Sequence, residues 1–256
     1  MNMTMPHPDV AVSDARAVVP AEDHHSGWIR NVTIKERVFG IRLANTERGR
    51  CDASLLISRM YATRGYSINS PLVYGPNRIT LTAASDGVVR GTVTLGIDSP
   101  AGILADDIFK DDIDAYRQRG ARVCEISKLA VDPGMRSKHA LAALFHTLFI
   151  YGRYLYGCTD IFIEVNPRHV KFYETMLGFT RIGELRENRR VNAPAYLLHL
   201  CLEHAAKHIE LHGDTSDKDD KDRSLYPYFF SKQEEEGIAH RLFNTTWAAE
   251  THKRGR

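Results

Sequence analysis

The sequence predicts one α/β domain, with a mixed, mostly antiparallel sheet of about seven strands and helices on both faces. Two observations carry this prediction. Apolar residues alternate with polar ones over 79–84 and again over 88–97, around a Ser-Asp-Gly turn, which is the pattern of a β-hairpin. Further along, an apolar strand at 123–131, a helix at 137–156 and an apolar strand at 159–165 follow one another, as in a strand–helix–strand crossover.

The remaining elements follow from shorter patterns. Apolar residues at positions 53, 56, 57, 60 and 61 have helical spacing, and a glycine follows each expected helix end before the final strand pair. In chain order, the sequence predicts a strand at 34–43, helices at 47–65, 106–119 and 168–177, and strands at 180–185 and 195–203 around a basic loop at 186–192.

Composition divides the chain into four parts. Residues 1–30 are polar, contain three prolines and are expected to form a disordered N-terminal arm, and residues 31–212 form the folded domain. Residues 213–223 are a charged linker. Residues 224–256 form an aromatic-rich C-terminal extension, expected to dock on its own domain or on a second subunit, which would make the protein a homodimer.

The bulk composition excludes several classes of function. Of 256 residues, 43% are hydrophobic and 26% charged, and the net charge of +2 gives no reason to expect a nucleic-acid partner. We find no apolar run of the roughly 18 residues that cross a bilayer and no apolar signal segment in the first thirty residues. The four cysteines are scattered, without the spacing of a zinc site, so we expect a cytoplasmic protein with reduced thiols.

Three of the twelve histidines have a spacing that could bind a metal. His204, His208 and His212 are four residues apart and would share one helix face. No acidic or cysteine ligand pattern accompanies them. We therefore expect solvated helix histidines and no metal.

The segment 165–179 carries the first functional motif. It resembles the strand–helix segment V-x-N-x-x-A-x-x-F-Y-x-x-x-G-F of GNAT acyltransferases, with His169 in place of a small residue. The matching residues are Asn166, Phe172, Tyr173, Gly178 and Phe179. The resemblance implies that Tyr173 protonates the leaving thiolate, which the pKa values of about 10 for a phenol and about 8.5 for a thiol allow. The structural alternative is a tyrosine that packs beside Phe172.

The segment C-E-I-S-K-L-A-V-D-P at 124–133 carries the second motif. It resembles the fourth GNAT strand, in which backbone amides, here around Leu129 and Val131, pair with pantetheine and stabilise an oxyanion. The narrower pattern E-x-S-K/R-x-A-V is similar to N-acyl amino acid synthases and acyl-homoserine lactone synthases. Residues 103–202 resemble the FeeM-type N-acyl amino acid synthases in particular, a GNAT-like family.

The polar residues of this strand are candidates for acceptor binding. Glu125 and Ser127 share one face, and Lys128 begins the other unless a bulge intervenes. Glu125 would hold the ammonium group and remove its proton, directly or through water; an ion pair with Arg122 is the alternative. For Lys128 a structural and a functional role stay open.

Four more residues are assigned to the acceptor. Asn166 and His169 are assigned to substrate binding through the resemblance. A carboxylate on the acceptor calls for an arginine fork, for which Arg59 and Arg64 are candidates, with 186–190 as the alternative region.

The turn at 135–140 departs from the GNAT pattern. Both glycines of the usual R/Q-x-x-G-x-G/A loop, whose amides bind the pyrophosphate of coenzyme A, are replaced, and two cations are added. The change favours a single phosphate, carried as phosphopantetheine on an acidic acyl carrier protein; a solvated helix start is the alternative. The residues assigned to pantetheine and carrier are Leu129, Val131, Arg136, Ser137, Lys138, His139, Ala140 and Arg168, with Arg153 added to the basic rim.

These motifs predict an N-acyltransferase of lipid biosynthesis that moves a long acyl chain from a pantetheine thioester to the amino group of an amino acid. The thioester, on acyl carrier protein or coenzyme A, is a co-substrate, and no tightly bound cofactor is expected. The alternatives are an acetyl-CoA-dependent small-molecule N-acetyltransferase and a non-catalytic binding module of the same fold. A lactone synthase is disfavoured because its N-terminal Trp- and acid-rich pattern is missing here.

Overall fold

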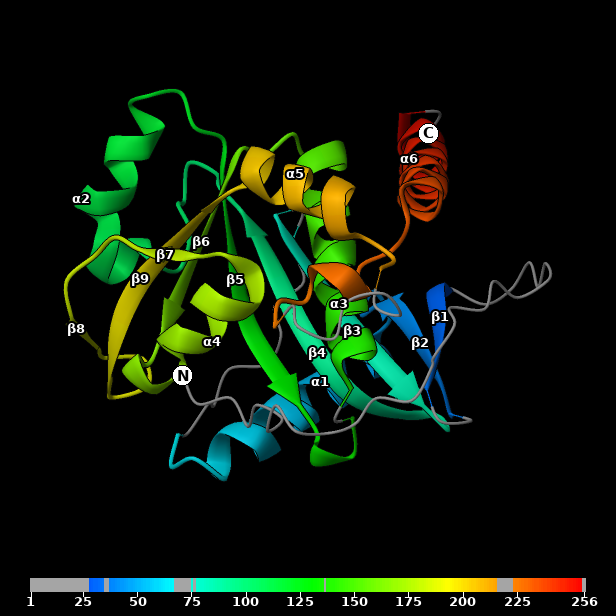
Figure 1. Ribbon diagram of the computed structural model, residues 1–256, viewed down its shortest axis with the longest axis horizontal. Helices are drawn as coiled ribbons and strands as arrows, with labels where there is room; N and C mark the ends of the chain where they lie inside the picture. The colour runs from blue at the N-terminus through cyan, green and yellow to red at the C-terminus, as the bar shows by residue number, and fades with distance from the viewer. Residues whose placement is uncertain are drawn as a thin grey trace.

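The computed structural model describes residues 28–34, 37–66, 75, 77–135, 137–215 and 223–254, and the side chains of this part from 39 to 244. Its backbone is drawn in Figure 1. Arg136, His24 and His25 lie outside the described residues.

Nine strands are found in the described part of the chain. They are paired in the order β1-β2-β3-β4-β5-β6-β9-β7, with β8 paired to β9 off this path. Only β5 and β6 run parallel. The strands are β1 Trp28–Ile34, β2 Arg37–Leu43, β3 Arg78–Ser85, β4 Val88–Ile97, β5 Val123–Val131, β6 Asp160–Val165, β7 Thr180–Arg181, β8 Arg186–Asn188 and β9 Ala193–Cys201.

Helices cover both faces of this sheet, as predicted (Figure 1). One face carries α1 and α2, and the other carries α3, α4, α5 and the C-terminal extension. The helices are α1 Glu47–Ala62, α2 Asp106–Arg117, the 3-10 turn η1 Pro133–Met135, α3 Lys138–Ile150, the π-helical turn η2 Tyr151–Leu155, α4 Pro167–Leu177, α5 Leu202–His212, the 3-10 turn η3 Tyr226–Tyr228 and α6 Lys232–Arg254.

Alternate residues of the same strands build two different environments. On the α3 face, residues such as Leu81, Val93 and Leu95 join one large apolar cluster. The opposite face holds two smaller apolar clusters, one under α1 and one under α2. Because successive strand residues point to opposite faces, polar residues alternate onto this second face. The buried ones are Thr82, Thr92, Thr94, Glu125, Ser127 and Glu164.

A β-bulge reverses the alternation within β5. Thr94 pairs with Ser127 and Thr92 with Ala130, so two residues of β5 lie opposite one residue of β4. Lys128 sits in the bulge with φ of 52°, in the left-handed region. After the bulge, the Leu129 side chain packs in the apolar α3 cluster. With strict alternation, the Lys128 side chain would point into that cluster instead. The bulge therefore keeps the lysine out of that core.

The parallel pair β5–β6 separates soon after it forms. Register pairing runs only from Val123 with Asp160 to Glu125 with Phe162, although both strands continue. Within the described residues, the edge of β5 beyond Glu125 that faces β6 has no strand partner. Its backbone N–H and C=O groups are therefore available to a ligand.

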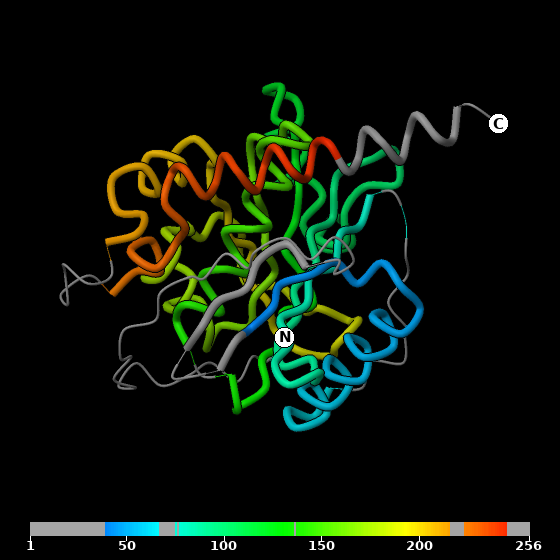
Figure 2. The backbone as a smooth tube through the Cα atoms, turned by 90° about the vertical axis from the view of Figure 1, so that its right-hand side faces the viewer, coloured from blue at the N-terminus to red at the C-terminus, as the bar shows by residue number. Residues whose placement is uncertain are grey.

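The C-terminal extension docks on its own domain. Tyr226, Phe229 and Phe230 are buried in the α3 cluster, and the His146 ring stacks on both phenylalanines at centroid distances of 4.8 Å. Glu235 of α6 accepts hydrogen bonds from Tyr154 and from His146, the latter at 3.2 Å. Figure 2 shows α6 crossing this side of the molecule. The extension therefore docks on its own domain, the first of the two alternatives that the sequence left open.

Several expected boundaries differ from the structure. An additional strand β1 begins at Trp28, inside the expected arm, and the expected basic loop contains β8. The last long strand ends at Cys201, where α5 begins. Edge and very short strands bury little, so their apolar pattern is weak, which explains nine strands against the predicted seven or so.

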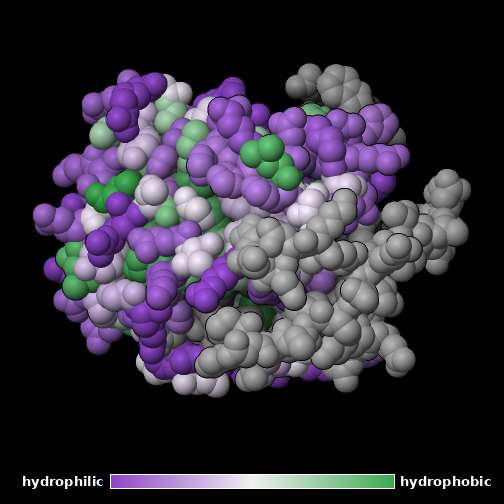
Figure 3. All heavy atoms as spheres, viewed as in Figure 1, coloured by the Kyte–Doolittle hydropathy of each residue, from purple (hydrophilic) through white to green (hydrophobic). Residues whose placement is uncertain are grey.

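The visible surface is mostly hydrophilic. In Figure 3 the coloured part of this face shows apolar residues only in small separate patches. No helix among the described residues has both the length and the apolar character required to cross a membrane.

Candidate active site

Glu125 is a buried carboxylate, and it is the last residue of β5 that pairs with β6. Its side chain is 3% exposed, and Oε2 accepts a hydrogen bond from the Ala105 backbone N–H at 3.1 Å. Oε1 has no hydrogen-bond partner in the described part of the protein. Burial raises the pKa of Glu125, against the effect of the Leu104 and Ala105 amides. Within the part of the chain that the structure describes, no ion pair of Glu125 with Arg122, the structural alternative, is found.

A cavity of about 310 Å³ opens beside this carboxylate. The start of β3, the end of β4 and the loop 99–104 line it, with Arg78 and Asn77 among the polar groups and Ile97 and Ile103 among the apolar ones. Gly96 lies across from Glu125 in register, and a Cβ there would come within 3.0 Å of Glu125 Cγ. The missing side chain therefore makes room for the carboxylate.

Two other polar residues of β5 lie near Glu125: Ser127 by strand alternation and Lys128 at the bulge. Ser127 is 4% exposed, and its Oγ has no partner among the described residues. Burial lowers the pKa of Lys128, Arg78 adds to that effect, and Glu125 opposes it. Lys128 is thus within electrostatic reach of Glu125, as the bulge alternative predicted.

A second carboxylate was missed by the sequence analysis. Glu164 of β6 shares the face of Glu125 and is 5% exposed. Its Oε2 accepts hydrogen bonds from Arg190 and, at 3.3 Å, from Asn188 Nδ2. Its Oε1 has no partner in the part of the chain described. Burial is the largest cause that raises the pKa of Glu164 to about 7.

Tyr173 lies on the α3 side of the sheet, in the large apolar cluster. It is fully buried on α4, with Phe172 and Phe179 edge-on to its ring. Burial raises the pKa of Tyr173 well above its usual value, and Tyr61 of α1 adds to the shift. These two tyrosines belong to apolar clusters on opposite faces of the sheet. The phenol is therefore protonated at neutral pH.

Asn166 is the N-cap residue of α4. Its Oδ1 accepts from the Arg168 backbone N–H at 3.3 Å as the N-cap, and its Nδ2 donates to the Pro194 carbonyl. His169 is buried, and burial together with Arg168 and Arg64 lowers its pKa to about 4. A neutral His169 thus lies near Arg64, and the Arg168 guanidinium contacts the Tyr66 hydroxyl at 3.5 Å.

Arg59 does not meet the Glu125 cavity. Its guanidinium forms an ion pair with Asp132 at 2.5 Å, and Arg90 approaches the same carboxylate at 3.4 Å. Arg59 thereby ties α1 to the turn after β5. Arg59 therefore lies away from this cavity, and Arg78 lines it; the assignment of Arg59 to the acceptor carboxylate stays a prediction.

The N-terminus of α3 carries the residues expected to meet the donor. Ser137 caps the helix by accepting from the Ala140 N–H at 3.4 Å. Lys138 lies 5.0 Å from the Tyr228 ring centroid, and the His139 ring is edge-on to the same tyrosine at 4.8 Å. The extension thus borders this helix start. Arg153 does not belong to the predicted basic rim. It lies in η2, beyond the C-terminal end of α3 and about 20 Å from the start of that helix.

Leu129 and Val131 contribute through the backbone. Their side chains are buried in the α3 cluster, 1% and 5% exposed. Their strand edge is the one that β6 leaves unpaired. A pantetheine arm would therefore meet their backbone groups and not their side chains.

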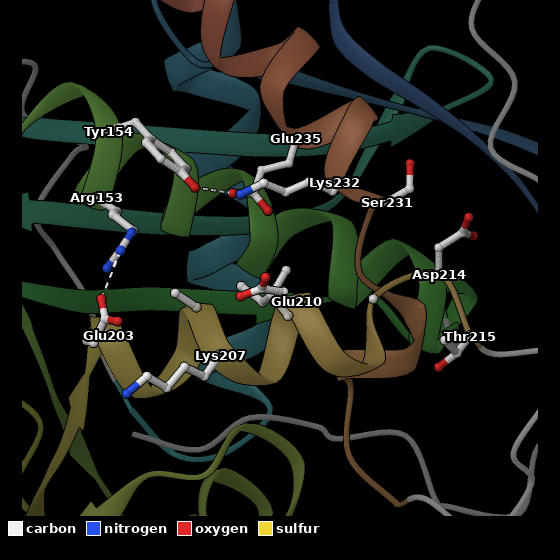
Figure 4. A pocket seen from close by; sticks show the side chains of 13 residues that line it. Arg153, Tyr154, Glu203, Lys207, Glu210, Asp214, Thr215, Ser231, Lys232 and Glu235 are labelled. Atoms are coloured by element: carbon white, nitrogen blue, oxygen red, sulfur yellow. Dashed lines mark hydrogen bonds and ion pairs between the residues drawn. The ribbon is translucent and has the colours of Figure 1, made fainter.

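A larger cavity of about 370 Å³ lies elsewhere, between α5, η2 and the start of α6 (Figure 4). Its polar lining includes the Arg153–Glu203 ion pair at 2.9 Å and the Tyr154–Glu235 hydrogen bond. None of the catalytic candidates lines it. Nor do the described residues include any group of three or more potential metal ligands; the His208 ring stacks on Tyr226.

Comparisons with known proteins agree with this geometry. The model of the family "N-acyl amino acid synthase FeeM" matches residues 52–201. The solved structure of FeeM, an N-acyl amino acid synthase from uncultured soil microbes, is 26% identical and covers 67% of this chain and 94% of its own, with a TM-score of 0.61. An acyl-CoA N-acyltransferase from Pseudomonas aeruginosa is 14% identical over 64% of this chain and 98% of its own, with a TM-score of 0.45. The AHL synthase LasI is 12% identical over 64% and 90%, with a TM-score of 0.46. No match was found among curated proteins.

The fold and the matched family define an acyltransferase with the GNAT fold. The family model spans more than half of the chain. The protein therefore belongs to the FeeM family of N-acyl amino acid synthases.

Proposed function

We propose that the enzyme transfers a long acyl chain from the phosphopantetheine of an acyl carrier protein to the amino group of an amino acid. The observation that carries the acceptor side is Glu125, whose buried Oε1 has no partner among the described residues and borders a cavity. A buried carboxylate with a free oxygen suits an ammonium group, because the pair neutralises both charges away from water. Arg78 of the same cavity suits the amino acid carboxylate.

The donor side is supported by the unpaired edge of β5. A pantetheine arm is an extended chain of amides, which can hydrogen-bond to such an edge as an additional strand would. Tyr173 of α4 keeps its proton at neutral pH, so it suits protonation of the leaving thiolate.

The start of α3 favours a carrier protein over free coenzyme A. Lys138 and His139 occupy the helix N-terminus, Ala140 stands near the second glycine position of the usual loop, and Arg136 precedes them in the sequence. Cations at this place attract an acidic carrier and its single phosphate. Rim charges act mainly on the association rate and are screened by salt over about 8 Å.

The test compares the same long acyl chain on carrier protein and on coenzyme A, with a mixture of amino acids and mass spectrometry of the products. We expect an N-acyl amino acid, higher kcat/KM with the carrier, and a decrease in that value as salt rises. Arg136→Glu with Lys138→Glu should raise KM for the carrier and change kcat little. The control pair Lys207→Glu and Lys232→Glu, at the distant cavity of Figure 4, should leave KM for the carrier unchanged.

Two results would overturn the proposal. Equal efficiency with acyl coenzyme A and no salt effect would indicate a coenzyme A-dependent enzyme. The absence of any acylated amine in the products would remove the acceptor class.

A further inference from the structure

Two buried carboxylates flank the gap between β5 and β6. Glu125 pairs in register with Phe162, and Glu164 lies two residues further along β6 on the same face. Strand geometry puts their Cα atoms about 8 Å apart before the gap widens. Each carboxylate has one oxygen without a hydrogen-bond partner in the described protein. The Ser127 hydroxyl of the same region also has no partner there. Unpartnered buried polar atoms are costly, so this arrangement indicates a site that a polar ligand completes.

Arg190 fixes the second carboxylate. From the turn between β8 and β9, its guanidinium contacts Glu164 Oε2, Asp107 and, at 2.5 Å, the Leu104 carbonyl. Asn188 donates to the same oxygen of Glu164. Because both donors use Oε2, Oε1 is the atom left for a substrate. Leu104 also borders the Glu125 cavity, so one arginine connects the two carboxylates.

We propose that Glu164 is the catalytic proton acceptor for the amine, that Arg190 positions it, and that Glu125 holds the ammonium group. The inference rests on the proposed transfer to an amine. The ammonium gives one proton to Glu164 Oε1, and its nitrogen attacks the thioester carbonyl carbon. The second proton leaves the nitrogen as the carbon–sulfur bond breaks. Tyr173 protonates the thiolate and regains a proton from the intermediate, and Glu164 releases its proton to water.

The charges around Glu164 suit this task. Asp107 of α2 and Glu125 of β5 face it and raise its pKa in addition to burial, and Arg190 lowers it. The resulting pKa of about 7 leaves the group half ionised at neutral pH, close to the optimum for a general base. The backbone amides of Leu104 and Ala105 stabilise the Glu125 carboxylate, and no arginine among the described residues forms an ion pair with it. Glu125 is therefore suited to binding a cation.

The decisive experiment is the pH dependence of kcat/KM for the best amine acceptor. In the wild type it should rise with pH through a midpoint near 7. Glu164→Gln should lower it at least about a hundredfold at neutral pH and abolish this midpoint, leaving a rise that follows the free amine. Arg190→Met removes a neighbouring positive charge and should move the midpoint to higher pH by about one unit. The matched controls are Glu236→Gln and Arg241→Met, exposed residues of α6 away from both carboxylates, which should leave the profile unchanged.

A second measurement does not depend on turnover. Carbon-13 NMR of labelled glutamate carboxyls should show a titration near pH 7 that Glu164→Gln removes and Arg190→Met moves upward. A Glu164 that titrates near 4 would overturn the proposal, and so would an unchanged pH profile in Glu164→Gln. If the enzyme acylates amines but no amino acid, the proposed acceptor class is wrong. The pH profile of kcat/KM for those amines still decides the role of Glu164.

Discussion

The face of the sheet under α3 and the face under α1 and α2 use alternate residues of the same strands, but they differ in how buried polar atoms are treated. Under α3 the strands contribute an almost continuous apolar surface, with residues such as Leu95 and Ile126 against Leu144. The opposite face buries hydroxyl and carboxyl groups, and Glu125 and Glu164 each keep an oxygen without a partner in the described chain. One face builds the fold, and the other is prepared for a ligand.

Physical costs support that division. A buried polar group without a hydrogen bond costs about 1–3 kcal/mol, a large fraction of the stability of a domain. The second face retains several such groups close to the gap between β5 and β6. Apart from Tyr173, the candidate acid on the α3 side, substitutions under α3 should therefore change stability, and substitutions of the carboxylates on the other face should change activity.

The largest stability effect is expected under α3. Leu144→Ala removes a fully buried side chain that packs on β4 near Gly91, and should lower the free energy of unfolding by about 2–5 kcal/mol. The kcat/KM of the folded fraction should stay near wild type. Urea unfolding with parallel kinetics checks both; a loss of activity without loss of stability would reverse the assigned roles of the faces.

Tyr173→Phe should lower kcat by about ten- to a thousandfold, because the leaving thiolate loses its acid. The ring keeps its contacts with Phe172 and Phe179, so unfolding should change little. Steady-state kinetics with one acyl donor measures the effect. Wild-type rates would remove Tyr173 from the mechanism.

Gly96→Ala tests the space made for Glu125. The added Cβ would lie 3.0 Å from Glu125 Cγ and 3.1 Å from Oε1, so the carboxylate must move. We expect a decrease of about tenfold in kcat/KM for the amine, in line with the cost of misplacing a catalytic group. Gly152→Ala is the control, because its Cβ would meet nothing closer than 3.7 Å. Equal kinetics in both variants would show that this space is not needed.

The smallest effect concerns stability on the polar face. Thr92→Val keeps the shape of the side chain and removes a buried hydroxyl without a partner, so the free energy of unfolding should stay equal or rise by up to about 1 kcal/mol. Thr80→Val is the matched contrast, since it breaks the 2.8 Å hydrogen bond to Thr94 and should cost about 1 kcal/mol. A larger loss for Thr92→Val than for Thr80→Val would contradict this reading of the face.

The sequence predicted the parts of the fold that depend on local periodicity. The hairpin β3–β4, the strand–helix–strand unit and the position of Glu125 on β5 follow from alternation and helical spacing, and the FeeM family match confirms the stated resemblance. The docked extension was anticipated from its aromatics, but its partner His146 was not.

Contacts between distant residues were beyond that reasoning. Glu164 occurs in an apolar strand segment, and Arg190, which holds it, is 26 residues further along the chain. The pair of Arg59 with Asp132 spans 73 residues and was not predicted either. The available signal for Glu164 was a charged residue inside the apolar run 161–165, because such a residue is rarely buried without a partner.

The most direct test of the division between the faces is Glu125→Gln, measured for stability and kinetics together. The raised pKa means that folding disfavours the ionised carboxylate, so the wild type loses stability as pH rises through the folded pKa. The variant does not titrate there. Our account predicts equal or higher stability than wild type at pH 8, unchanged KM for the acyl donor, and kcat/KM for the amine about a hundredfold lower. Lower stability at pH 8 with unchanged amine kinetics would contradict it.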